Sequence, residues 1–173
     1  MYTNEIYNHL RQFCTRLNAQ FDVIPCDQLD TVQIIKYPLV LVVNTDPSTR
    51  AGSHWTSIFI KNKWSPIEFY DSYGLGIKSY AKNFEDFVNR LGRPVQKNVV
   101  QLQSCDSEVC GHYAVYFLYM RINNYAPKLL YCKFSKNYKQ NDMIVFNFIK
   151  SKCYLLSHRC FVKNEQCCKP FCK

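Results

Sequence analysis

The chain has 173 residues, of which 47% are hydrophobic, and its formal net charge is +9. This length and apolar content are typical of a single globular domain that buries one core. No run approaches the roughly 18 consecutive apolar residues of a membrane-spanning helix, and the first residues lack the basic-then-apolar order of a secretory signal. We therefore expect one soluble domain over residues 1–173, no membrane association, and ten cysteines that are mostly reduced.

The positive charge is concentrated in the last part of the chain. Residues 1–125 carry 12 basic and 11 acidic side chains, whereas residues 126–173 carry 10 basic and 2 acidic ones. Basic side chains interleaved with tyrosine and phenylalanine are typical of a surface that binds nucleic acid or another polyanion. A solubilising lysine-rich face is the alternative, because nine of the ten basic residues in 126–173 are lysines.

Hydrophobic periodicity predicts the elements in chain order. Apolar residues at helical spacing predict a first amphipathic helix that is capped by Thr3 or Asn4 and continues to Phe21. Apolar runs and alternation between turn residues predict four strands, at 38–44, 54–61, 66–71 and 98–103. Three further helices are expected at 80–91, 110–122 and about 142–156.

A cysteine followed by glycine, Cys110-Gly111, opens the apolar helix over 110–122. The thiolate is the nucleophilic form of cysteine, and the positive end of a helix dipole favours that anion. A histidine that accepts the thiol proton completes the activation, and His54, at the start of a predicted strand, has no evident structural role. Cys105 is the rival nucleophile, but it lies in the loop before the helix.

Two carboxylates compete to orient His54. Strand alternation places Glu68 and Asp71 on opposite sides, so only one of them can reach the imidazole. Asp71 is favoured because it ends its strand beside a Ser-Tyr-Gly turn, although an aspartate there can also simply stabilise the turn. Gln103, seven residues before Cys110, carries an amide that can donate to an oxyanion together with the Cys110 backbone N–H.

The remaining candidates concern the substrate groove and the other histidines. Trp55 and the loop containing Gly52 and Ser53 are expected to flank a narrow substrate groove. His9 and His158 are expected on the surface, and His112 is expected to point to another side of the helix than Cys110.

Three segments of the chain carry a family resemblance. They are PLVLVVNTDPSTRAGSHWTSIFI (38–60), EFYDSYGLG (68–76) and QSCDSEVCG (103–111). Over roughly residues 1–125 the chain resembles the adenovirus protease family of adenain-like cysteine endopeptidases, which share chemistry and core with the SUMO-type ubiquitin-like-protein proteases. The resemblance implies an α+β, adenain-like fold with a papain-like site on a central mixed sheet and with the nucleophile at the N-terminus of a buried helix. It assigns His54, Asp71 and Cys110 to the triad and Gln103 to the oxyanion hole.

The resemblance also implies a biological role. It predicts a monomeric viral endopeptidase that cleaves virion precursor proteins in the virion and the host nucleus. Its chemistry would need no cofactor and no metal, and DNA and a short basic peptide would stimulate it. Adenoviral members tether that peptide through a cysteine, whereas residues 91–100 contain none, so a divergent virus or a Polinton-like element is the expected source.

Two other functions remain as alternatives. One is a deconjugating protease for a ubiquitin-like modifier. The other is a catalytically inactive DNA-binding or virion structural protein with the same fold.

The last residues are basic and rich in cysteine. Cys153, Cys160, Cys167, Cys168 and Cys172, with His158, invite comparison with a zinc site. Their spacings fit poorly, because structural zinc sites favour pairs with about two to four intervening residues. Free thiols or a disulfide are the alternatives. The terminal sequence KPFCK also suggests a segment that docks on the domain in place of the activating peptide.

Overall fold

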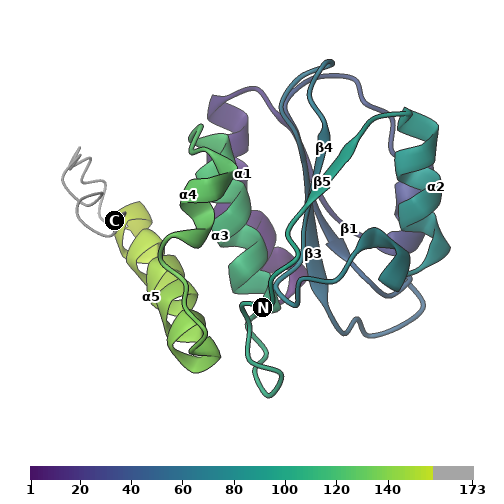
Figure 1. Cartoon of the computed structure of the whole chain (residues 1–173). Helices are drawn as coiled ribbons and strands as arrows, with labels where there is room; N and C mark the ends of the chain where they lie inside the picture. Colours follow the sequence, from purple (N-terminus) through teal and green to yellow (C-terminus); the bar gives the residue numbers. More distant parts are fainter. Residues whose placement is uncertain (158–173) are drawn as a thin grey trace.

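A five-stranded mixed sheet separates two layers of helix in the computed structural model (Figure 1), which describes the backbone of residues 1–157 and the side chains of residues 1–151. The strand order is β1-β2-β3-β4-β5, with parallel pairs at both edges and antiparallel pairs in the middle. The strands are β1 (Gln20–Pro25), β2 (Leu39–Asn44), β3 (Trp55–Ile60), β4 (Ile67–Tyr70) and β5 (Val95–Lys97). The α-helices are α1 (Thr3–Arg16), α2 (Lys82–Leu91), α3 (Cys110–Ile122), α4 (Pro127–Tyr131) and α5 (Tyr138–Ser157). Short 3₁₀ turns are η1 (Cys26–Thr31) and η2 (Ile77–Ser79).

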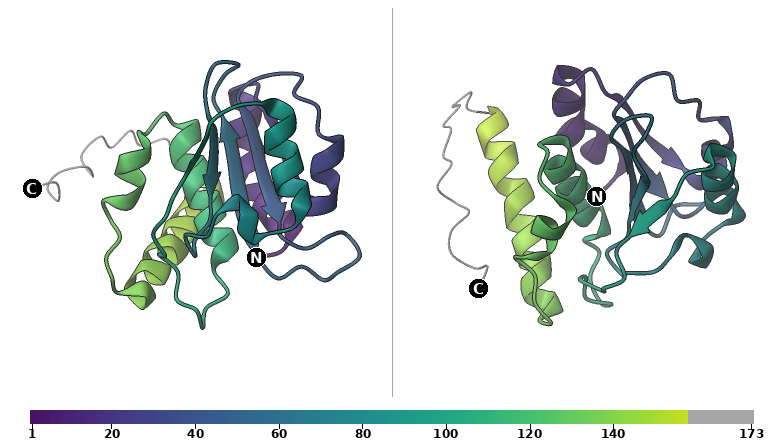
Figure 2. Two further views of the ribbon diagram at one scale, coloured as in Figure 1. Left: turned by 45° about the vertical axis from the view of Figure 1, so that its right-hand side comes forward. Right: turned by 45° about the horizontal axis from the view of Figure 1, so that its top comes forward.

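The sheet is buried on both faces, which explains the continuous apolar run of β2. Val40 and Val42 pack with α1 and α3, whereas Leu39, Leu41 and Val43 pack with α2 and η1. Figure 2 shows α2 on one side of the sheet and α1 and α3 on the other, with α5 outside α3. Side chains alternate across a strand, so a strand covered on both faces needs apolar residues at every position.

Helix α3 is central because it is covered on nearly all sides. Buried residues occupy most of its length, including Tyr113, Tyr116 and Phe117. A helix that is apolar all round belongs inside a protein, and here the sheet, α1, α4 and α5 surround it. The prediction of an α+β domain with a central mixed sheet and Cys110 at the start of a buried helix is confirmed. None of the helices in the described part of the chain has the length and apolarity to cross a bilayer.

The predicted first helix is too long. It ends at Arg16, and Asn18 adopts a left-handed conformation with φ 51° that stops it. Phe21 lies instead in β1, which pairs in parallel with β2. Its helical spacing is misleading, because Phe21 stacks on Tyr7 of α1 with ring centroids 5.2 Å apart and so belongs to the same apolar face.

The predicted strand over 98–103 is wrong. The strand is β5, three residues earlier, and residues 98–103 form an irregular segment. The Asn98 side chain forms hydrogen bonds with the backbone of Asp71. The N–H groups of Leu102 and Gln103 both donate to the Ser72 carbonyl, at 2.8 and 3.1 Å. These bonds tie the segment to the end of β4, next to the candidate site.

Candidate active site

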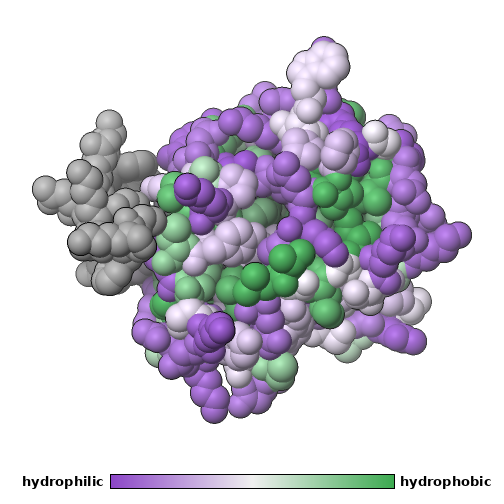
Figure 3. Space-filling model, in the orientation of Figure 1, coloured by the Kyte–Doolittle hydropathy of each residue, from purple (hydrophilic) through white to green (hydrophobic). Residues whose placement is uncertain are grey.

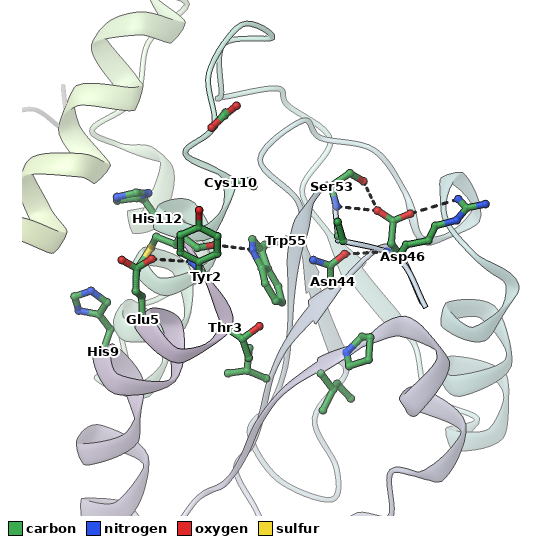
Figure 4. A pocket seen from close by; sticks show the side chains of 18 of the residues that line it. Tyr2, Thr3, Glu5, His9, Asn44, Asp46, Ser53, Trp55, Cys110 and His112 are labelled. Carbon is green, nitrogen blue, oxygen red and sulfur yellow. Dashed lines mark hydrogen bonds and ion pairs between the residues drawn. The ribbon is translucent and has the colours of Figure 1, made fainter. Parts of the chain in front are cut away.

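Cys110 is the first residue of α3, is buried and lines a groove (Figure 4). The backbone N–H groups of Trp55 and Gly111 help to lower the pKa of its thiol. These groups and the N-terminal end of the helix dipole stabilise a negative sulfur. The start of α3 therefore provides the surroundings that a reactive thiolate needs.

His54 immediately precedes β3, and its ring is fixed on several sides. Its Nε2 lies 2.6 Å from Asp71 Oδ1, and Cys110 also interacts with the imidazole and raises its pKa. The rings of Tyr73 and Tyr80 stack on the imidazole, with centroids 4.8 and 6.0 Å away. Because Nε2 faces Asp71, Nδ1 is the nitrogen left to exchange a proton with the thiol.

Asp71, the residue after β4, is fully buried and has two functions at once. Its Oδ1 accepts the N–H of Tyr73 at 3.1 Å and its Oδ2 accepts the N–H of Leu75 at 2.8 Å, so it stabilises the turn. The same carboxylate faces His54. Asn98 fixes the Asp71 backbone from the other side, donating to its carbonyl at 2.5 Å and accepting its N–H at 2.9 Å. Turn stabilisation and orientation of His54 are therefore compatible.

Glu68 does not reach His54. It faces α3, where Arg121 donates two hydrogen bonds to its carboxylate at 2.6 and 2.7 Å. Both side chains of this ion pair are almost completely buried. Of the two competing carboxylates, the structure places only Asp71 beside the imidazole.

The three groups shift one another's pKa values toward an ion pair. Burial alone would lower the pKa of His54, but its hydrogen bonds to Asp71 and Cys110 prevail and raise the pKa to about 9. Burial would likewise raise the pKa of Cys110, but the hydrogen bond and positive charge of His54 prevail and lower it. Asp71 is desolvated too, yet its bonds to His54 lower its pKa. The shifts of all three groups therefore favour their charged forms, thiolate, imidazolium and carboxylate.

The pH dependence of alkylation follows from these directions. We expect iodoacetamide to modify Cys110 at a pH well below the ordinary thiol pKa, with the rate falling only as acid protonates the thiolate. His54→Ala removes the imidazolium, so the acid limb should move to higher pH. Peptide cleavage should fall again as the pH rises through about 9, because His54 then loses the proton that it gives to the leaving amine. The rate of Cys110 alkylation as a function of pH, followed by mass spectrometry, measures the acid limb. The same pH dependence in wild type and His54→Ala would contradict the ion pair.

Gln103 lies buried on the segment that leads to α3. Its Oε1 accepts the Ser72 hydroxyl at 2.6 Å, and its Nε2 donates to the Ser107 carbonyl at 2.8 Å. An amide nitrogen carries two hydrogens, so a second donor remains for a substrate oxygen. The Cys110 N–H, at the first helical position, has no acceptor within its helix. The orientation of the Gln103 amide is thus fixed at both of its ends.

The predicted substrate residues Gly52, Ser53 and Trp55 all line the groove, whose volume is about 1050 Å³. Gly52 has φ 84°, and a Cβ there would lie 2.4 Å from Asn44 Nδ2. Ser53 donates from its N–H and its hydroxyl to Asp46 at 2.8 and 2.5 Å. The loop between β2 and β3 is therefore held in one conformation where it lines the groove.

Other predicted residues fall around this site. His9, expected on the surface, lines the groove together with His112, whose pKa burial lowers to about 4. Cys105 is exposed in its loop, and its sulfur accepts a hydrogen bond from Gln101 at 3.2 Å. Within the described side chains, no cluster of three His, Cys, Asp or Glu residues is placed to hold a metal. The cysteine-rich tail considered for zinc, for a disulfide and for docking lies outside the described side chains.

Three residues of the site were not identified from the sequence. Ser72 fixes the Gln103 amide, Tyr73 stacks on His54, and Asn98 fixes Asp71. Ser72 and Tyr73 directly follow Asp71, so adjacency was an available signal. Asn98 is 27 residues away, and only the fold brings it to the site.

No protein-family model matches the chain, and no curated protein matches it in sequence. Solved structures do match. Two crystal structures of the ASFV pS273R protease, one of the Se-Met form, superpose with a TM-score of 0.59 each at 16% identity. The chain has the adenain-type cysteine protease fold. The superpositions cover 84% and 83% of this chain and 66% and 65% of the solved chains, so the chain spans slightly less than two thirds of their length.

The predicted papain-like, adenain-like fold class is therefore confirmed. At 16% identity the likeness establishes the fold alone. An activity for this chain must be argued from its own side chains.

Proposed function

We propose that the chain is a cysteine endopeptidase. The observation that carries this proposal is the contiguous arrangement of Cys110, His54 and Asp71, with Cys110 lining a groove of about 1050 Å³. Each of the three is buried, and their pKa shifts favour the charged, reactive pair. A structural cysteine in an apolar core would have a raised pKa, as Cys14 does, at about 12.

The proposed reaction is acyl transfer to sulfur. The Cys110 thiolate attacks the scissile carbonyl, and the C–N bond breaks as His54 gives its proton to the leaving amine. His54 then removes a proton from water, which hydrolyses the thioester and frees Cys110. Asp71 orients the imidazole and stabilises its positive charge. The Gln103 amide and the Cys110 N–H stabilise the oxyanion.

Gln103→Ala tests the oxyanion assignment. Loss of one oxyanion donor costs about 10²- to 10³-fold in kcat, and we expect a loss of that size with little change in KM. The thiolate does not depend on Gln103, so alkylation of Cys110 should proceed at the wild-type rate. Steady-state kinetics on a peptide substrate and the alkylation rate together check this; an unchanged kcat would remove Gln103 from the oxyanion hole.

The proposed substrates are virion precursor proteins, and the proposed places of action are the virion and the host nucleus. These proposals rest on the sequence resemblance and on the fold shared with a viral protease. A monomer without membrane attachment and without a chemical cofactor is proposed on the same grounds.

DNA is the proposed stimulating polyanion. Exposed lysines gather around α4 and the start of α5, at Lys128, Lys133, Lys136 and Lys139. Their positive charge would attract phosphates through a salt-dependent interaction. A higher cleavage rate in the presence of DNA, with the increase lost at high salt, would support this proposal.

An activating peptide has a candidate place beside the edge strand β5. A cleft of about 300 Å³ lies there between β5, Phe117 and Tyr131. Val99 and Val100 are exposed next to it, and apolar surface interrupts the hydrophilic face that carries β5 and α4 in Figure 3.

Digestion of capsid precursor proteins tests the proposed function. Purified wild type and Cys110→Ala would be incubated with the precursors, with and without DNA, and new termini identified by mass spectrometry. Discrete termini with wild type alone are the expected result. A SUMO or ubiquitin C-terminal electrophile that labels Cys110 efficiently would instead indicate a deconjugase. Alkylation of Cys110 no faster than that of Cys105 would indicate the inactive DNA-binding alternative.

A further inference from the structure

The start of the chain forms part of the groove. Met1, Tyr2 and Thr3 line it together with Trp55 and Cys110. The amino terminus lies beside the start of α3 in Figures 1 and 2, and Tyr2 lies close to Trp55 and Cys110 in Figure 4. The first residues are therefore placed where a substrate would bind.

The backbone of this segment is fixed by the first turn of α1. The Tyr2 N–H donates to Glu5 Oε2 at 2.7 Å, and the Tyr2 carbonyl accepts the N–H groups of Glu5 and Ile6 at 3.1 Å each. A reciprocal cap of this kind sets the angle at which the chain enters a helix. The peptide between Met1 and Tyr2 is held in one orientation as a result.

The Met1 carbonyl accepts a hydrogen bond from Trp55 Nε1 at 3.1 Å. Trp55 also lines the groove together with Cys110, and its backbone N–H helps to lower the pKa of the Cys110 thiol. Trp55 therefore lies between the nucleophile and the start of the chain, to which its ring is hydrogen-bonded.

Gly111 shows how tightly these elements meet. A Cβ at Gly111 would lie 2.9 Å from Met1 Cβ and 3.4 Å from both Ile6 Cδ1 and Trp55 Cδ1. Real Cβ contacts are rarely that short, so the starts of α1, β3 and α3 pack together only because residue 111 has no side chain.

We propose that Met1 is a positioning residue for the groove. Its carbonyl holds the Trp55 indole as a fixed wall beside Cys110, against which the substrate binds. A wall that is already in place spares the substrate the entropy of ordering it, so its loss should weaken binding more than it slows chemistry. The predicted effect on KM rests on the proposed protease function, whereas the contact itself does not.

Trp55→Phe tests the indole hydrogen bond, and Trp64→Phe is the matched control. Phenylalanine keeps an aromatic ring but has no donor. One hydrogen bond corresponds to roughly a two- to tenfold effect, so we expect Trp55→Phe to raise KM about three- to tenfold with kcat and Cys110 alkylation unchanged. Trp64 is 83% exposed, and its substitution should change neither constant. Equal KM values for the two variants, or a fall in kcat and alkylation in place of the rise in KM, would overturn the proposal.

Fluorescence tests the Met1 contact without any substrate. In a Trp64→Phe background Trp55 is the sole tryptophan. Deleting Tyr2 moves Met1 into the cap position and takes its carbonyl away from the indole, whereas Tyr2→Ala keeps the backbone in place. The Trp55 emission should shift to the red in the deletion variant and stay unchanged in Tyr2→Ala. If the Trp55 emission of the deletion variant does not shift, the proposed role of Met1 is overturned. If the emission shifts but the wild-type protein cleaves no substrate, only the proposed protease function fails.

Discussion

Cys110→Ala is expected to abolish peptide cleavage, with kcat at least about 10⁴-fold below wild type, because loss of the nucleophile of a catalytic triad costs up to roughly 10⁶-fold. Alanine removes only the sulfur of Cys110, which lines the groove at the first position of α3. The fold should therefore remain, with a melting temperature close to that of wild type. Initial rates on a fluorogenic peptide and a thermal melt measure both effects.

Cys105→Ala is the matched control for this prediction. Cys105 lies five residues before Cys110 and is exposed, with its sulfur bonded to Gln101. Its removal should leave cleavage intact. Cleavage that survives Cys110→Ala and disappears with Cys105→Ala would move the nucleophile to the loop.

The parts of the site that depend on local sequence could be predicted. A thiol at a helix start is visible as Cys110-Gly111 before an apolar run, and strand alternation separates Glu68 from Asp71. These signals are local because helix dipoles and side-chain alternation act over a few residues. The structure places Glu68 with Arg121 and Asp71 with His54, on opposite sides of the sheet.

The parts that depend on long-range pairing could not be predicted. β5 is three exposed residues long, and β1 begins only four residues after α1 ends, so neither shows a clear period. Gln103 lies on an irregular segment whose bonds go to Ser72, 31 residues away. The bond between Met1 and Trp55 spans 54 positions. No local pattern reports contacts of this kind, because the fold alone brings the partners together.

The orienting carboxylate should be nearly as important as the nucleophile. We expect Asp71→Asn to lower kcat by about 10²- to 10⁴-fold. The lower limit applies if only the electrostatic stabilisation of the imidazolium is lost, and the upper limit if His54 is also held in the wrong tautomer. The amide has the same shape but no charge, so the pKa of His54 should fall from about 9 toward its ordinary 6.5. Less imidazolium means less thiolate, and alkylation of Cys110 at pH 7 should slow in parallel with cleavage.

Glu68→Gln separates this catalytic loss from a loss of stability. Glu68 and Arg121 form an ion pair in which both side chains are almost completely buried, and removing one partner of such a pair destabilises a protein by about 3–5 kcal/mol. Chemical denaturation should show that loss for Glu68→Gln, while the folded fraction keeps the kcat and the Cys110 alkylation rate of wild type. The opposite pattern, with full kcat in Asp71→Asn and a collapse of kcat in folded Glu68→Gln, would mean that the wrong carboxylate has been assigned to His54. Glu68 lies in β4 and Asp71 directly follows it, so the two acids are only three residues apart. This pair of variants therefore compares the loss of a negative charge beside the imidazole with the loss of one in the core.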